Sequence, residues 1–246
     1  MMLTIAAREW RSLFLSPLAW TLLAAAQGLL AWIFLLLVQD FRLLQGRLTG
    51  LENAPGVTDL VAAPLFRAAA WCLLLITPLL TMRLFSEERR ARTFDLLLSA
   101  PVGTTDMVFG KYLSVVLVLW LVVGLAVLMP LSLSFGATLD FGKLLAGTLG
   151  LGLLAAGFAA AGLYLSTLTA QPMIAAAATF GVLLGFWIVD LQETTGRLFG
   201  YLSPLRHYDG LLLGLVNSAD LAYYLLFSAT FLGLAIRRLD DLRLRD

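Results

Sequence analysis

The sequence predicts an all-α polytopic membrane protein with six transmembrane helices, and three observations support this fold class. Hydrophobic residues make up 60% of the 246 residues and charged residues only 13%. Soluble globular domains are about half apolar and about a quarter charged, and the mean hydropathy here is +0.90. The apolar residues gather in long uncharged runs, such as residues 12–39. Such a run exceeds the ~20 residues that a helix needs to cross the hydrocarbon layer.

The first 15 residues predict an amphipathic helix that lies in the membrane interface. Apolar side chains recur at helical spacing on one side, at Leu3, Ala7, Trp10 and Phe14, and polar ones on another, at Thr4, Arg8, Arg11 and Ser12. Trp and Arg suit the interface plane, and Arg8, Trp10 and Arg11 are therefore its candidate interfacial residues. Ser16-Pro17 separates this helix from the first span, because Pro disfavours helix in the residue before it and often opens a new helix.

Six uncharged or nearly uncharged segments follow as predicted spans: residues 18–38, 64–82, 112–135, 144–168, 173–189 and 221–236. Residues 40–63 are predicted as an outer loop with a short helix near 41–48. The fourth span is rich in Gly and Ala, and small residues let helix backbones approach closely in lipid. Contact with a second subunit, a gate and packing within one subunit all fit this composition.

Residues 190–220 predict an outer segment with structure of its own. Its residues 207–216 are mostly apolar and too few to cross a membrane, which favours a short re-entrant or interfacial helix before the sixth span. Arg206, His207, Tyr208 and Asp209 are the polar and aromatic candidates for a site on this segment. For His207 alone, a structural role at a helix start is favoured over a catalytic one.

The distribution of Lys and Arg predicts the orientation. Eleven of these residues fall at the two chain ends and between spans two and three, and six fall on the other side. Because cytoplasmic loops carry the excess of positive residues, both termini are predicted to be cytoplasmic. The net charge of +1 gives no argument for a nucleic-acid partner.

The charged segment 86–111 is predicted to be a cytoplasmic lever between two spans, because it mixes apolar and charged side chains as a surface helix does. The chain has one His, no Walker A pattern and no Gly-x-Ser-x-Gly, so no catalytic, metal or cofactor site is expected on it. Ion-coupled transporters normally hold charges inside their spans, and here these are nearly absent. The energy source is therefore expected on a partner that acts on this segment.

The sequence resembles the ABC-2 type transporter permeases over essentially the whole chain. The segment between spans two and three is similar to their cytoplasmic coupling loop through Glu87-Glu88, Thr93, Asp95, Leu96-Leu97-Leu98, Pro101 and Gly110-Lys111. Arg92 stands where Gly is usual and Asp95 where Glu is usual. The start, residues 8–17, resembles the connecting helix of that family, and residues 202–210 with Gly214 and Tyr223-Tyr224 are similar to its gliding-motility branch.

The resemblance implies a single ABC-2 type transmembrane domain over residues 1–246, in the bacterial cytoplasmic membrane. It also implies a permease that pairs with a second copy of itself or a homologous permease. Two copies of a separate ATPase would bind ATP and Mg and dock on residues 86–104, and an extracytoplasmic accessory protein is a further expected partner. The predicted docking residues are Glu87, Glu88, Arg89, Thr93, Phe94, Asp95, Leu97 and Pro101.

These features leave three candidate functions. The first is an ATP-driven exporter, and the second is an ATPase-linked complex that remodels an envelope or motility apparatus without moving solute. The third, a membrane-embedded enzyme acting on lipid, requires polar groups clustered at one membrane level, which the spans do not show.

Overall fold

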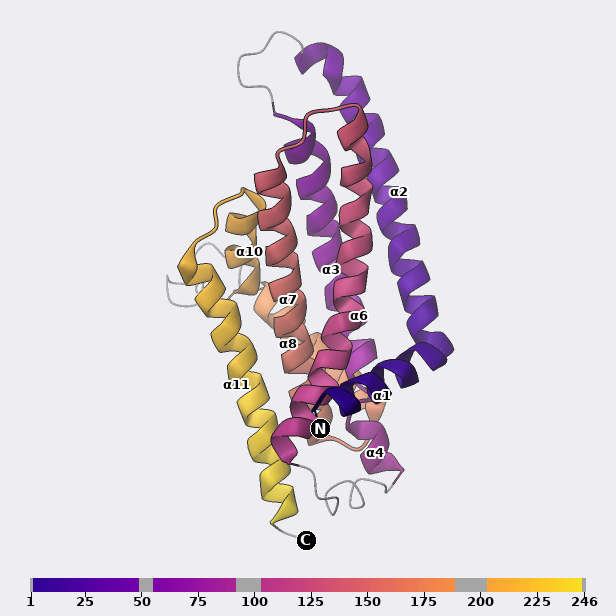
Figure 1. The fold of residues 1–246 in the computed structure, drawn as a ribbon, viewed down its shortest axis with the longest axis vertical. Helices are drawn as coiled ribbons and strands as arrows, with labels where there is room; N and C mark the ends of the chain where they lie inside the picture. Colours follow the sequence, from indigo (N-terminus) through magenta and orange to yellow (C-terminus); the bar gives the residue numbers. More distant parts are fainter. Residues whose placement is uncertain (1, 49–54, 92–102, 189–202, 245–246) are drawn as a thin grey trace.

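The computed structural model describes residues 2–48, 55–91, 103–188 and 203–244, and helices account for most of these. The long helices run side by side along one axis, and α1 crosses them near one end (Figure 1). That end, which also holds α4, is called the base below. In order, the elements are α1 (Met2–Leu15), α2 (Pro17–Leu48), η1 (Thr58–Ala62), α3 (Ala63–Thr81), α4 (Ser86–Arg90), α6 (Thr104–Ser132), η2 (Leu133–Phe135), α7 (Phe141–Leu168), α8 (Pro172–Ile188), α10 (Pro204–Leu212) and α11 (Ser218–Arg243).

Five of the described helices are long and apolar enough to cross a membrane: α2, the continuous η1–α3 segment, α6, α7 and α11. The predicted fifth span is α8, which is equally apolar but counts 17 residues before the undescribed residues 189–202 begin. A 17-residue helix is at the lower limit for spanning the bilayer. The all-α polytopic class is thus confirmed, with five or six crossings in the part of the chain that the structure describes.

Several helices extend further than the hydropathy predicted. Residues 41–48 are helical, as predicted, but they continue α2 instead of forming a separate helix, and the first two turns of α6 lie inside the charged segment 86–111. At the other end of the chain, α11 runs on to Arg243, well past residue 236. Hydropathy marks where lipid ends, whereas a helix continues wherever its backbone hydrogen bonds can form, so these helices are longer than the spans predicted within them.

Ser16 and Pro17 separate α1 from α2 as predicted. The Ser16 Oγ lies 3.4 Å from the backbone N–H of Leu18, and Pro17 takes the first position of α2. A side-chain oxygen at this place satisfies one of the free N–H groups of the first turn. The amphipathic segment is therefore a separate helix that meets the bundle at its base.

The small residues of α7 serve packing within the subunit. A Cβ placed on Gly152 would lie 2.3 Å from the Trp120 ring of α6, and one on Gly162 would lie 2.3 Å from the Thr81 hydroxyl of α3. Most of the α7 span is buried against α3, α6, α8, α10 and α11. Of the roles that the sequence left open for these residues, the structure supports close packing inside one subunit.

The short helix of the predicted outer segment is α10, which lies beside α7 and α11 (Figure 1). It runs over Pro204–Leu212 and not over residues 207–216. Gly214 has a φ of +83°, and the N–H groups of Gly214 and Leu215 bond to the carbonyls of Leu211 and Gly210. This pairing is a Schellman motif, which ends a helix at a left-handed residue and so explains the wrong boundary.

Candidate functional site

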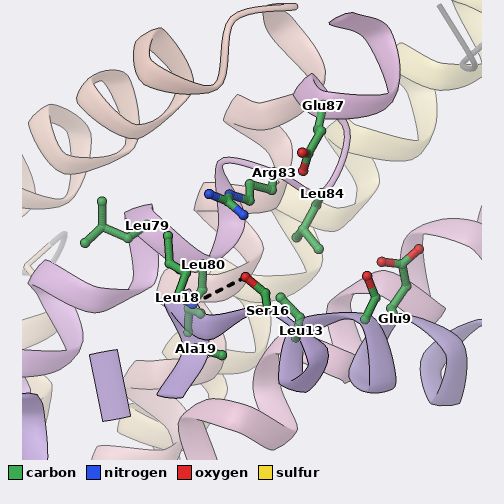
Figure 2. Close-up of a pocket in the computed structure, with 11 residues that line it drawn as sticks. Glu9, Leu13, Ser16, Leu18, Ala19, Leu79, Leu80, Arg83, Leu84 and Glu87 are labelled. Carbon is green, nitrogen blue, oxygen red and sulfur yellow. Dashed lines mark hydrogen bonds between the residues drawn. The ribbon is translucent and has the colours of Figure 1, made fainter. Parts of the chain in front are cut away.

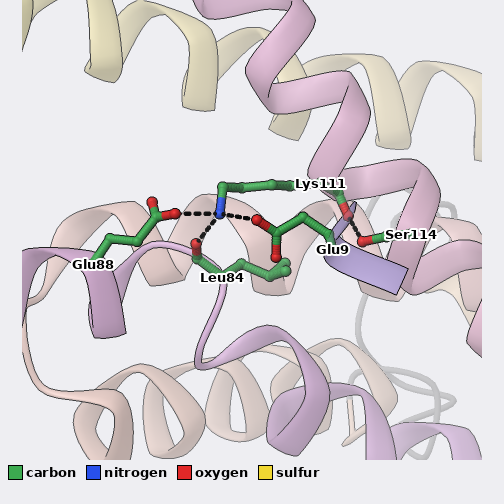
Figure 3. A network of polar contacts seen from close by, with 5 residues as sticks. All are labelled: Glu9, Leu84, Glu88, Lys111 and Ser114. Carbon is green, nitrogen blue, oxygen red and sulfur yellow. Dashed lines mark hydrogen bonds and ion pairs between the residues drawn. The ribbon is translucent and has the colours of Figure 1, made fainter. Parts of the chain in front are cut away.

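A buried lysine joins three segments of the chain at the base (Figure 3). The Nζ of Lys111, in the second turn of α6, donates to Glu9 Oε1 of α1 at 3.1 Å and to Glu88 Oε1 of α4 at 2.7 Å. It also donates to the Leu84 carbonyl at 2.8 Å, and it lies 5.1 Å from the centre of the Phe85 ring. These contacts, called the Lys111 cluster below, use all three donors of the ammonium group.

The Lys111 cluster is an ion network in a largely buried place. The Lys111 side chain is 2% exposed, against 21% for Glu9 and 25% for Glu88. Removing a buried charge from water is costly, and only close partners with good hydrogen-bond geometry offset that cost. The network therefore fixes the relative positions of α1, α4 and α6 as long as all three charged residues are present.

A glycine lets α1 reach this place. A Cβ on Gly110 would lie 2.9 Å from the Ile5 side chain and 3.0 Å from the Met2 carbonyl, so α1 crosses α6 nearly in backbone contact. Ala6 is the buried residue of α1, and Ile5 and Glu9 share its side of the helix. The side with Leu3 and Trp10 is exposed, as an interfacial helix requires.

The α4 helix is held against the end of α7. Ser86 Oγ donates to the Ser166 carbonyl at 3.0 Å, and Arg89 Nη1 donates to the Thr167 carbonyl at 2.6 Å. The last carbonyls of a helix lack backbone partners and carry partial negative charge, which an arginine complements. Arg89 thus makes a contact within the subunit, while Glu87 is exposed.

Beside the Lys111 cluster lies a cavity of about 90 Å³, called the α1–α3 cavity below (Figure 2). It opens between α1, the start of α2, and the turn that joins α3 to α4. One part of its lining is apolar and another is polar. The lining residues are Glu9, Ser12, Leu13, Ser16, Leu18, Ala19, Leu79, Leu80, Arg83, Leu84 and Glu87.

At the opposite end, α10 is tied to α3. The Arg67 guanidinium pairs with the Asp209 carboxylate, and both side chains are partly exposed. Tyr208 is fully buried, and its hydroxyl donates to the Phe66 carbonyl at 3.0 Å. Burial raises the pKa of the Tyr208 phenol well above its ordinary value, so the hydroxyl keeps its proton and donates.

The same helix is also tied to α11. His207 Nδ1 lies 2.6 Å from Asp220 Oδ1, and the imidazole stacks on the Tyr223 ring at 4.2 Å between centroids. The Tyr224 hydroxyl donates to the Pro204 carbonyl at 2.6 Å. His207 therefore sits inside α10 with two structural contacts, and Arg206 is on the exposed side.

The predicted site residues thus fall into separate groups. Glu87, Glu88 and Arg89 lie together at the base near Arg8, Trp10 and Arg11, and residues 206–209 lie on α10. Thr93, Phe94, Asp95, Leu97 and Pro101 lie outside the described residues. Within the described residues, no group of three or more His, Cys, Asp or Glu side chains is placed to hold a metal ion.

Sequence reasoning missed the contacts that join these residues across the chain. Glu9 and Lys111 were both in quoted motifs, yet nothing in either motif indicated that they pair. Arg67 and Asp220 were equally unassigned as partners of Asp209 and His207. Gly110 carried a usable signal, since small residues let helix backbones approach closely.

A family model for the ABC-2 family transporter protein matches residues 47–237. The chain belongs to this family. As an ABC-2 transporter protein it is a multi-pass membrane permease, a transport subunit that is not itself catalytic, from a family that generally works with an ABC ATPase. No curated protein matches the chain.

Proposed function

We propose that this permease belongs to an ATP-driven exporter and is moved by a separate ATPase that docks on residues 86–104. The observation that supports this is the Lys111 cluster, which connects α4 to the start of α6 and to α1. A push on α4 reaches the α6 span through one buried ammonium group. It also reaches the end of α7 through Ser86 and Arg89.

Three docking candidates lie in the described part of the chain, and their different surroundings suggest different roles. Glu88 and Arg89 are engaged inside the subunit, whereas Glu87 is exposed. Glu87 is therefore proposed as a direct polar contact with the ATPase, and Glu88 and Arg89 as residues that transmit the movement. Asp95, Phe94 and Leu97 remain proposed docking contacts from the sequence.

The complex is proposed to contain two permeases, this chain with a second copy or a homologue, and two ATPase copies that bind ATP and Mg. Its place is the bacterial cytoplasmic membrane, with both termini and the base in the cytoplasm, as the excess of Lys and Arg there favours. Because α7 fills the centre of the subunit, the proposed substrate path runs between the two permeases and not through one of them.

A charge reversal tests the docking proposal. Glu87→Lys is expected to reduce the amount of ATPase that co-purifies with the permease from mild detergent, and to reduce ATP hydrolysis by the complex in parallel. Asp40→Lys is the matched control, because Asp40 is an exposed carboxylate at the far end of α2. If both variants keep the ATPase and its hydrolysis at the unmodified level, the docking proposal fails.

The second candidate is an ATPase-linked complex that remodels an envelope or motility apparatus without transporting solute. The observation that favours it is the exposed apolar tip after α10, formed by Leu213, Leu215 and Val216, which suits an extracytoplasmic accessory protein. The resemblance of residues 202–210 to the gliding-motility branch points the same way. Complexes reconstituted in vesicles separate the candidates, because a remodeller hydrolyses ATP without moving solute.

The accessory partner is best tested at this tip. Deleting α10 would remove the buried Tyr208 and disturb the bundle, so the exposed side chains are the better target. Changing Leu213, Leu215 and Val216 to Ser is expected to release the accessory protein and leave ATPase binding unchanged. Retention of every co-purifying protein would contradict the accessory proposal alone.

A further inference from the structure

The α1–α3 cavity is flanked by features of a membrane–water interface. Trp10 and Trp20 are both exposed, and the indole N–H of Trp20 donates to the Phe14 carbonyl at 2.8 Å. Exposed Trp residues gather at the level of the lipid headgroups. The α1 helix, with one polar and one apolar side, meets the first span at the same place, so the cavity opens where headgroups lie.

The lining of the cavity divides into two chemical halves. Leu13, Leu18 and Leu79 supply apolar side chains, and Leu18 and Leu79 belong to the spans α2 and α3. In Figure 2 the Arg83 guanidinium and the Glu87 carboxylate lie on the same side of the cavity. A ligand with a charged head and apolar chains matches this division.

Arg83 is the candidate group for binding a ligand in this cavity. It is half-buried in the turn between α3 and α4, and it makes no hydrogen bond or ion pair with any described residue. Partly buried guanidinium groups usually bind carboxylates or phosphates, which match their planar donors. On the same measure of volume a water molecule needs roughly 10–15 Å³, so a cavity of about 90 Å³ holds a group of several heavy atoms.

We propose that the α1–α3 cavity binds the headgroup of a phospholipid that carries both a phosphate and a primary ammonium, namely phosphatidylethanolamine. The phosphate binds Arg83 and the hydroxyls of Ser12 and Ser16, and the ammonium binds one oxygen of Glu87, which leaves the other oxygen for the contact proposed with the ATPase. The acyl chains leave the cavity along the apolar half of its lining. A lipid in this position bridges α1 to the turn between α3 and α4.

The charges of the lining select among lipids. Because Lys111 neutralises Glu9, the lining presents one negative charge, Glu87, and one positive charge, Arg83, and an anionic headgroup without an ammonium leaves Glu87 without a cation beside it. A quaternary ammonium cannot donate hydrogen bonds to the carboxylates and is bulkier. Phosphatidylethanolamine is thus preferred over phosphatidylglycerol and over phosphatidylcholine.

Native mass spectrometry of the full chain, purified in mild detergent, tests this preference. The probe is an equimolar mixture of the three lipids with identical acyl chains. Phosphatidylethanolamine is expected to remain bound preferentially, and Arg83→Gln to lower its retention about tenfold, the effect of losing a hydrogen bond to a charged group. Arg90→Gln is the matched control, because Arg90 is exposed on α4 and does not line the cavity.

A second variant keeps the test valid if Arg83→Gln fails to fold. Ser12 is exposed on α1, so Ser12→Phe fills the cavity without changing its charge and without disturbing the packed side of the helix. It is expected to expel the lipid to the same extent as Arg83→Gln. Equal retention of the three lipids by the unmodified chain, or full retention of phosphatidylethanolamine by both variants, overturns the proposal. The experiment contains no ATPase, so its failure is independent of the docking proposal.

Discussion

At the base, one buried ammonium group joins three segments of the chain, whereas at the opposite end two separate contacts, the Arg67–Asp209 ion pair and the His207–Asp220 hydrogen bond, each join α10 to a single neighbouring helix. The Lys111 side chain is 2% exposed, while Arg67 and Asp209 are 57% and 38% exposed. Water screens the exposed Arg67–Asp209 pair and screens the buried Lys111 contacts much less. The base is therefore expected to respond as one unit, and the opposite end as a set of nearly independent contacts.

Removal of the lysine should give the largest effect. Lys111→Met leaves Glu9 and Glu88 facing each other in a poorly solvated place, and losing one partner of a buried ion network costs about 3–5 kcal/mol. The measurement is the unfolding midpoint of the purified chain in detergent. Combining it with Glu9→Gln and Glu88→Gln should restore part of the loss, and an unchanged midpoint in the single variant would contradict the idea of a single unit.

Adding a single methyl group between α1 and α6 should cause the next largest loss of stability. Gly110→Ala places a Cβ 2.9 Å from Ile5, and overpacking of this kind costs about 1–3 kcal/mol. We expect α1 to loosen and to become accessible to protease while the spans stay folded. Gly124→Ala is the matched control, because a Cβ there meets nothing within 4 Å on the same helix.

At the opposite end, loss of the buried Tyr208 hydroxyl should lower the free energy of unfolding more than loss of the Asp209 charge. Tyr208→Phe leaves the Phe66 carbonyl without its donor and is expected to lower the free energy of unfolding by about 0.5–1.5 kcal/mol. The unfolding midpoint measures this change. A loss as large as that of Lys111→Met would remove the difference between the two ends.

The exposed ion pair should give the smallest effect. Asp209→Asn is expected to change the free energy of unfolding by less than about 1 kcal/mol, since exposed pairs contribute little. In a double-mutant cycle, Asp209→Asn and His207→Gln should be additive, because they act on different partners, Arg67 and Asp220. Strong coupling between them would show that α10 also responds as one unit.

The spans and the separate first helix could be predicted because both leave a periodic or compositional trace. Uncharged runs located α2, α3, α6, α7, α8 and α11, and Ser16-Pro17 located the break after α1. The helices are longer than the predicted spans where charged residues continue a helix, as at residues 104–111. The end of α10 was missed because its signal is a single left-handed Gly214 inside an apolar run.

The candidate site was less predictable, because its contacts join residues far apart in the sequence. The acidic pair Glu87-Glu88 looked uniform, yet one side chain is exposed and the other pairs with Lys111. The difference arises because Lys111 of α6 reaches Glu88 of α4, a contact between residues 23 positions apart. The apolar pattern on α1 indicated an amphipathic helix, but it did not reveal that Glu9 pairs with Lys111.

The central position of α7 has a consequence for how the chain is made. Two of its packing partners, α3 and α6, are synthesised before it, and α10 and α11 are synthesised after it. Gly157 of α7 receives the Phe227 ring of α11, so this hollow faces lipid until the last helix leaves the insertion machinery. A chain that ends before α11 therefore leaves this glycine-lined surface of α7 uncovered.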